Sequence, residues 1–313
     1  MDVRKIQSIA GSSYSVSLPK DWVKKRGLKE GKTLAIYENH DGSLTLDSNS
    51  EKMNVAEEMT IKVEDFKESL ECVLLSVYYL GVERINIISS KEFTREIRAA
   101  IRGSLDKMSG TEISYEDEKK VTLSILLDKN KINVHQILYR IILLLDSELS
   151  SISNGKVDLK EAEFSEREID RLYNLLRRII NVSLRESQIL QSSQIKKVVN
   201  IPAYSLISRK FENIGDILFK MTFQSGKEKV NVNLKNNKGI ELILNELERI
   251  SRAILSGCDE IFSEDRAFSE SVKKEVALMK EDRMKEFFTQ LARYIVDVEQ
   301  QLGDISFYNM KLK

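Results

Sequence analysis

The second half of the chain contains almost no residue that breaks a helix. Only one of the two prolines, Pro202, lies beyond residue 133, and the whole chain has 13 glycines. Apolar side chains in this half recur every three or four residues, which is the period of an α-helix. Six helices are therefore predicted, at residues 133–152, 164–191, 202–225, 239–262, 266–282 and 284–311. We expect a mainly α protein with two three-helix bundles in this region.

Three of these helices carry a continuous apolar seam, which is typical of helices that pack in a bundle. The seam of the second helix consists of Ile169, Leu172, Leu176, Ile179 and Ser183. The seam of the third consists of Ala203, Ile207, Phe211, Ile214, Leu218 and Met221. The seam of the last consists of Phe287, Leu291, Ile295, Val298, Leu302 and Ile305. We expect these side chains to form the core of the helical region.

The first 130 residues have a different pattern. Residues 1–47 show short runs of strand-like alternation around one short helix, which has Pro19 at its first position and stops at Gly27. Residues 55–130 alternate strand and helix patterns, which predicts a small α/β domain. The chain is therefore expected to be multidomain, with a β unit at 1–47, a linking α/β domain at 55–130 and a helical bundle domain at 131–313.

The β unit is small, and its first 34 residues are basic. Its four short strands and Trp22 supply too few apolar side chains to close a core, so we expect it to pair with a second copy. Residues 1–34 hold eight basic and three acidic side chains, although the whole chain has 49 of each sign. Such a local excess attracts a phosphate backbone. An ordinary solvated basic face explains the charge about equally well.

The order of residues in this unit closely resembles the SpoVT/AbrB family. The matching positions are Val3 to Ile6, Gly11, Val16 to Pro19, Trp22 to Lys25, Gly27 to Gly31 and Leu34 to Ile36. The resemblance implies a swapped-hairpin β-barrel, formed by a homodimer, that binds double-stranded DNA. It also implies that the DNA contacts are Arg4, Lys5, Lys24 and Lys25. Serines and a tyrosine at residues 12–14 replace the arginine that often follows the central glycine of the family, which favours contacts to phosphates over contacts to bases.

An acidic pair marks the helix predicted at 202–225. Glu212 and Asp216 lie one helical turn apart, and Gly215 allows a neighbouring helix to come close. A bound cation would relieve the repulsion between the two carboxylates, with Asp170 on a neighbouring helix as a third ligand. Oxygen ligands favour magnesium, manganese or iron. The alternative is an ordinary solvated acidic face.

Residues 211–217, which read Phe-Glu-Asn-Ile-Gly-Asp-Ile, look like the Glu-Arg-Ile-Gly-Asp signature of the PhoU family. The resemblance covers roughly residues 133–313 and implies that Glu212 and Asp216 bind a metal ion on the bundle surface. In a degenerate second copy these positions correspond to Arg293 and Asp297, or in another register to Gln300 and Asp304. Combined with a SpoVT/AbrB-like unit, the arrangement resembles the archaeal PhoU-related regulators, which are implicated in phosphate uptake.

Several classes of function lack the residues they require. The chain has two histidines, His40 and His135, and two widely separated cysteines. It therefore has too few of these residues to favour a closed zinc site or a nucleophile activated by histidine. No apolar stretch approaches the length of a membrane span, and no signal-peptide pattern opens the chain. We therefore expect a cytoplasmic protein that is not an enzyme and does not insert into a membrane.

The expected function is a DNA-binding transcriptional regulator of phosphate uptake and phosphate homeostasis, with a PhoU-like helical sensory domain. The alternative is a signalling adaptor that docks on a phosphate transporter or a sensor kinase and uses its N-terminal unit for dimerisation only. A metal-dependent phosphatase is the least favoured hypothesis, because one helix pair offers thin support for it.

Overall fold

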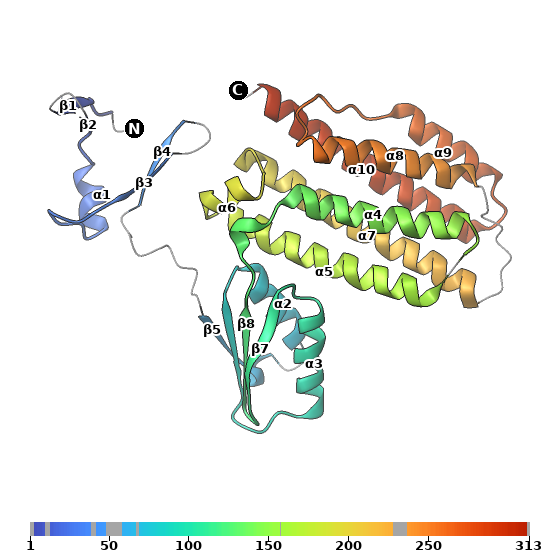
Figure 1. Cartoon of the computed structure of the whole chain (residues 1–313), viewed down its shortest axis with the longest axis horizontal. Helices are drawn as coiled ribbons and strands as arrows, with labels where there is room; N and C mark the ends of the chain where they lie inside the picture. The colour runs from blue at the N-terminus through green and yellow to red at the C-terminus, as the bar shows by residue number, and fades with distance from the viewer. Residues whose placement is uncertain are drawn as a thin grey trace. The chain divides into compact units, whose positions relative to one another are not determined.

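The fold is taken from a computed structural model, which describes residues 3–9, 13–38, 42–47, 58–66, 69–156, 158–227 and 237–311. The chain divides into two compact units, Met1–Asn54 and Val55–Lys313 (Figure 1). Each unit is described by itself. The described residues are mostly helical, with a small region of strands at the N-terminus.

The N-terminal unit consists of two β-hairpins and one short helix. Strands β1 and β2 pair antiparallel, and so do β3 and β4. The elements are β1 (Gln7–Ile9), β2 (Ser13–Ser15), α1 (Lys20–Lys25), β3 (Ala35–Glu38) and β4 (Leu44–Asp47). The described residues of one chain do not close a barrel, so the swapped-hairpin barrel stays a prediction that requires a second chain.

The short helix α1 begins one residue later than the sequence predicted and ends before Gly27, as predicted. Pro19 precedes it with extended backbone, and Gly27 follows it with a φ of 60°. The Gly27 amide donates to the carbonyl of Lys24, and the Leu28 amide donates to the carbonyl of Val23 at 3.1 Å. This pair of bonds is a Schellman motif, which requires the left-handed backbone that glycine adopts without strain.

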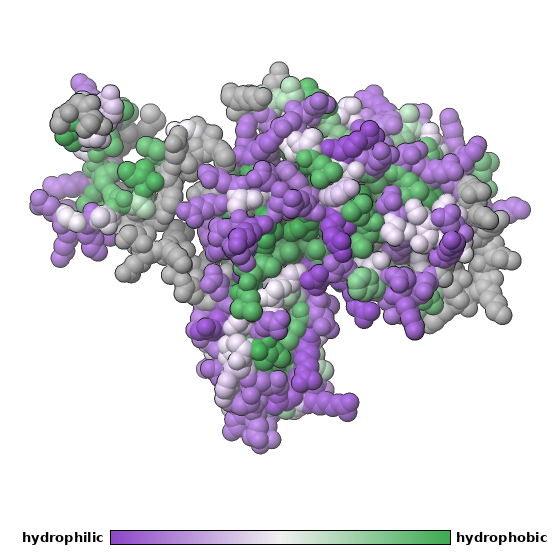
Figure 2. All heavy atoms as spheres, viewed as in Figure 1, coloured by the Kyte–Doolittle hydropathy of each residue, from purple (hydrophilic) through white to green (hydrophobic). Residues whose placement is uncertain are grey.

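Apolar side chains of the N-terminal unit stay open to solvent. Exposed fractions are 72% for Ile6, 62% for Ile36 and 64% for Leu44, and none of the described side chains of this unit is fully buried. Figure 2 shows hydrophobic side chains on the visible surface of this unit. The unit does not form a core within one chain, as its composition predicted.

The second unit begins with an α/β region built on one four-stranded sheet. The strand order is β5-β6-β8-β7, in which β5 and β6 are parallel and the other pairs are antiparallel. Helices α2 and α3 lie together on one face of the sheet (Figure 1). The elements are β5 (Glu58–Lys62), α2 (Leu70–Tyr79), β6 (Arg84–Ile88), α3 (Arg95–Asp106), β7 (Thr111–Glu116) and β8 (Lys120–Ile125), with a short 3-10 turn, η1 (Val63–Asp65), after β5.

The helical region has six long helices that share one apolar core. Helices α4, α5 and α7 pack on one another, as do α8, α9 and α10, while α7 contacts α10 and α4 contacts α8. All three predicted seams are buried in this core. The long helices are α4 (Val134–Ser153), α5 (Leu159–Ser183), α7 (Ile201–Lys227), α8 (Lys238–Leu255), α9 (Arg266–Leu278) and α10 (Asp282–Lys311).

Two predicted helices end earlier than expected. The helix predicted at 164–191 stops at Ser183 and resumes as α6 (Ser187–Ser192), which packs against the 3-10 turn η2 (Lys129–Lys131). In the break between them, Glu186 forms an ion pair with Lys129 at 2.9 Å. The helix predicted at 239–262 stops before Gly257, because Gly257 and Cys258 both have left-handed backbone, with φ values of 69° and 53°.

The α/β region is joined to the helical region by polar contacts from α5. Arg178 donates to the carbonyl oxygen of Tyr78 at 2.6 Å, and Asn181 donates to that of Tyr79 at 3.4 Å. These carbonyls belong to the last turn of α2, where backbone oxygens lack partners within the helix. Arg178 is buried, so the α2 carbonyl supplies part of the solvation that its cation has lost.

None of the helices in the described part of the chain combines the length and the apolar character that crossing a bilayer requires.

Candidate functional site

The four predicted DNA contacts lie on two elements of the N-terminal unit. Arg4 and Lys5 are in the segment that leads into β1, and Lys24 and Lys25 are in the last turn of α1. All four side chains are exposed. The negative end of the helix dipole stabilises the two lysines where they stand. The structure therefore leaves these cations accessible, and their contact with DNA stays a prediction.

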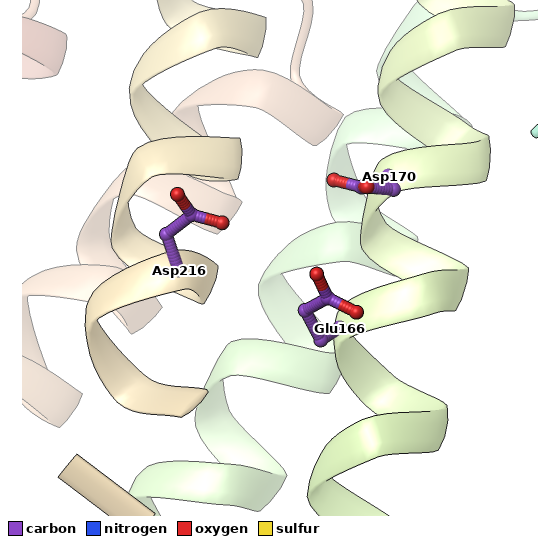
Figure 3. Close-up of side chains that lie close together, drawn as sticks. All are labelled: Glu166, Asp170 and Asp216. Atoms are coloured by element: carbon purple, nitrogen blue, oxygen red, sulfur yellow. The ribbon is translucent and has the colours of Figure 1, made fainter. Parts of the chain in front are cut away.

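Three carboxylates converge on the surface between α5 and α7. Glu166 and Asp170 lie on successive turns of α5, and Asp216 faces them from α7 (Figure 3). One oxygen from each side chain lies within 4.8 Å of the others, and all three residues are half-buried. We call these three residues the acidic cluster. Oxygen atoms at such spacing can share one cation.

Gly215 explains how α5 and α7 come close enough to form the acidic cluster. A Cβ atom at this glycine would lie 3.1 Å from Cδ1 of Ile169 and 3.3 Å from its Cγ2. Ile169 directly precedes Asp170, and Gly215 directly precedes Asp216. The close approach that the sequence predicted at Gly215 therefore places the two aspartates opposite each other.

Burial and mutual repulsion make it costly to ionise Glu166 and Asp170 together with Asp216. Loss of solvation raises the pKa of Asp170, and the nearby Asp216 raises it further. The pKa of Glu166 is raised by burial and then by Asp170 and Asp216. A proton or a metal ion relieves the same electrostatic cost. Lys220 neutralises part of the negative charge of the cluster, because its Nζ lies 3.6 Å from Asp216 Oδ2.

Glu212 lies beside the acidic cluster and not within it. Its Oε1 accepts a hydrogen bond from Arg209 at 3.3 Å, while its Oε2 is buried without a partner. Burial raises the pKa of Glu212 to about 7, and the Arg209 guanidinium opposes that rise. Glu212 lies one helical turn before Asp216 on α7 but is not one of the three residues whose oxygens converge.

Asp297 is separated from the other predicted metal ligands. It lies on α10, and its Oδ2 forms an ion pair with Nζ of Lys210 at 2.6 Å. Among the described residues, the acidic cluster is the one place where three or more carboxylate, imidazole or thiol ligands meet. Neither expected register of the second copy, at Arg293 with Asp297 or at Gln300 with Asp304, therefore forms such a group.

Sequence reasoning missed Glu166. It lies four residues before Asp170, the same spacing that drew attention to Glu212 and Asp216. The sequence therefore contained a second pair of carboxylates on one helix face, Glu166 and Asp170, which could have indicated the site. The pairing of Glu166 and Asp170 with Asp216 required the packing of α5 on α7.

Comparison with known proteins identifies the N-terminal unit alone. Residues 7–53 match the family model described as antidote-toxin recognition MazE, bacterial antitoxin. No curated protein and no solved structure gives a significant match to the chain. The resemblance of the helical region to PhoU proteins stays a prediction. The chain thus carries a MazE/AbrB-like antitoxin domain at residues 7–53, consistent with a SpoVT/AbrB-type domain.

Proposed function

We propose that this protein is a DNA-binding regulator, not an enzyme, and that its N-terminal unit works as a homodimer. The observation that carries the proposal is the match of residues 7–53 to the MazE family. MazE/AbrB-like domains bind DNA and form dimers. The exposed apolar side chains of this unit support the dimer, because a second copy would remove them from water.

In the proposed dimer, each chain presents Arg4, Lys5, Lys24 and Lys25 to the phosphate backbone. Two copies bring eight such cations to one assembly. Lysine and arginine contacts to phosphates fix the position of a protein on duplex DNA and carry no sequence information themselves. The proposal therefore assigns affinity to these four residues and leaves sequence preference to other contacts.

A binding assay with matched variants tests the proposal. Replacing Lys24 and Lys25 with alanine should weaken binding of labelled duplex DNA at least tenfold in fluorescence anisotropy at low salt. The control replaces Lys273 and Lys274, an adjacent pair of exposed lysines on α9. Equal weakening by both variants would mean that net charge, and not this face, governs binding.

Antitoxin-type regulation is a second candidate function, favoured by the description of the matching family. In this alternative the chain would also bind a protein toxin. A regulator that acts only on DNA needs no such partner. Purification of the tagged chain from its native cells, followed by mass spectrometry of stoichiometric partners, distinguishes the two, because a toxin would remain bound when DNA has been digested.

For the helical region we propose a divalent cation site, for magnesium, manganese or iron, at the acidic cluster. The convergence of three half-buried oxygen ligands supports it. Asp170→Asn combined with Asp216→Asn should abolish binding of Mn²⁺ measured by titration calorimetry. The control Glu270→Gln with Glu275→Gln, which removes two carboxylates from α9, should bind as the wild type does. Equal binding by both variants would exclude the site.

A role in phosphate homeostasis is proposed on the PhoU resemblance alone. The comparisons give it no support. The signalling adaptor, docking on a phosphate transporter or a sensor kinase, shares this basis and differs in needing no DNA. Reporter assays of phosphate-uptake genes in cells that lack the protein would separate both hypotheses from a regulator of unrelated genes.

A further inference from the structure

A second group of ionisable side chains lies inside the other half of the bundle. Arg249 on α8 donates from Nε to Oε1 of Glu246 at 2.6 Å, and from a terminal nitrogen to Oε1 of Glu299 on α10. Glu299 has no exposed surface, and Glu246 exposes 5%. The two carboxyl groups are buried, while the Arg249 side chain exposes 31% of its surface, so the charge of the carboxyl groups must be balanced mainly by groups of the protein.

Arg249 neutralises only one of the two carboxylates, Glu246 and Glu299. Two carboxyl groups and one guanidinium carry a net charge of −1 when all are ionised, and Glu299 Oε2 has no hydrogen-bond partner. The carboxyl group of Glu246 lies within hydrogen-bonding reach of Glu299. Burial, followed by this hydrogen bond, raises the pKa of Glu299 to about 8. One proton between the two carboxyl groups neutralises the whole group.

This group also holds the segment that begins α9. The backbone amide of Asp265 donates to Glu299 Oε1 at 3.2 Å. Arg249 donates to the carbonyl of Ser263 at 2.9 Å and lies 4.1 Å from the centre of the Phe262 ring. Asp265 is the N-cap residue of α9 and accepts from the Ala267 amide at 2.9 Å. The buried charges are thus bonded directly to the start of a helix.

Helix α9 has few other anchors. Phe268 and Val272 are the buried residues among the 13 of α9, whereas α8 buries eight of its 18 residues. Elements with few buried apolar contacts open at low free energy. In the described structure no charged side chain of α9 forms a hydrogen bond or an ion pair with Glu299. The groups that face Glu299 are therefore Glu246 and Arg249 from α8, and the Asp265 amide.

We propose that Glu246, Arg249 and Glu299 form a proton-dependent latch that holds α9 on the bundle. With one proton shared between the two glutamates, the latch bonds the 262–265 segment and α9 stays in place. When that proton is lost, a buried negative charge is left without balance, and opening of α9 lets water reach it. Opening uncovers the apolar faces of α8 and α10, which a partner could then contact.

The direction with pH follows from the two states of Glu299. In the closed state its pKa is about 8, whereas in the opened, solvated state it returns towards 4.5. Between these values opening releases a proton, so the opening constant rises as pH rises. The rise is up to about tenfold per pH unit. Below pH 4.5 and above pH 8 the constant levels off.

Hydrogen exchange of the full chain between pH 5.5 and 8.5 tests the latch, after correction for intrinsic exchange rates. Peptides from residues 262–278 should show an opening constant that rises up to tenfold per unit to about pH 8, while peptides from β6 should not. Glu299→Gln keeps the size of the side chain and cannot ionise, so it should flatten the α9 profile. Glu148→Gln, in the other half of the bundle, should leave the α9 profile unchanged.

Two results would overturn the latch. One is a wild-type α9 whose opening does not change with pH. The other is a Glu299→Gln protein whose α9 keeps the wild-type slope. If Glu299→Gln does not fold, Glu246→Gln replaces it, because it also removes one ionisable carboxyl group from the latch, and a retained slope there has the same meaning.

Discussion

In the N-terminal unit Ile36 exposes 62% of its surface, whereas in the helical region Phe211 exposes none. The two regions differ in the same way throughout: the described part of the first has no fully buried side chain, and the helices of the second share one continuous core. A region with its own core is stable as a single chain. A region without one depends on association, so its stability varies with protein concentration.

The charges of the two regions differ as well. The whole chain has no net charge, yet residues 1–34 hold eight basic and three acidic side chains, and the helical region gathers half-buried carboxylates at one place. Composition alone would have concealed both features. We propose contact with nucleic acid for the first region and cation binding for the second, and a specific substitution can disprove each proposal.

The largest effect is expected from truncation of a core residue. Phe211→Ala should lower the free energy of unfolding by about 3–5 kcal/mol, because it leaves a cavity in the helical core. Urea denaturation followed by circular dichroism measures this loss. Ile36→Ala, a truncation in the N-terminal unit, should leave that transition in place and weaken the dimer instead. If Ile36→Ala shifted the helical transition as far, the contrast between the regions would be wrong.

A smaller effect depends on pH. Burial raises the pKa of Glu148 to about 7, and the Thr222 hydroxyl opposes the rise with a hydrogen bond at 3.3 Å. Because the folded pKa is raised, the stability that the neutral carboxyl contributes is complete below pH 4.5 and is lost as pH rises through 7. Glu148→Gln should therefore be more stable than wild type at pH 8, by at most about 3 kcal/mol.

Thermal denaturation at pH 4 and pH 8 checks this expectation. At pH 4 both proteins carry a neutral side chain at position 148, so their difference in melting temperature should be small. An advantage of the variant that is equal at both pH values would show that packing, and not ionisation, distinguishes the two side chains.

The smallest stability effect concerns the approach of α5 to α7. Gly215→Ala places a methyl group 3.1 Å from Ile169, which should cost about 1–3 kcal/mol as the helices separate. Separation also moves Asp216 away from Glu166 and Asp170, so Mn²⁺ binding should weaken. Titration calorimetry of the variant gives the answer. Unchanged Mn²⁺ affinity together with unchanged stability would mean that the close approach does not shape the acidic cluster.

The sequence was informative where one physical pattern dominates. Seams at helical spacing predicted which faces of α5, α7 and α10 are buried, because a bundle can bury only one stripe of each helix. Gly27 predicted the end of α1, because a left-handed residue stops a helix. Gly215 predicted a close helix contact for a similar local reason.

Features that depend on packing between distant segments could not be predicted from the sequence. Glu166 joins the acidic cluster through the alignment of α5 with α7. The latch unites Glu246 and Arg249 with Glu299, which lies about 50 residues away along the chain. At the break after Ser183, Glu186 forms an ion pair with Lys129, which lies 57 residues away along the chain. Single-sequence patterns describe each helix by itself and do not show which side chains face each other across an interface.

The salt dependence of DNA binding is the most direct test of the central claim, that a dimeric N-terminal unit holds DNA through its basic residues. Each phosphate neutralised changes the slope of log affinity against log salt by about −0.9, so eight cations give a slope as steep as about −7. We expect a steep wild-type slope, and a much flatter one when Arg4, Lys5, Lys24 and Lys25 are all replaced by alanine. Identical slopes for the two proteins would contradict the account.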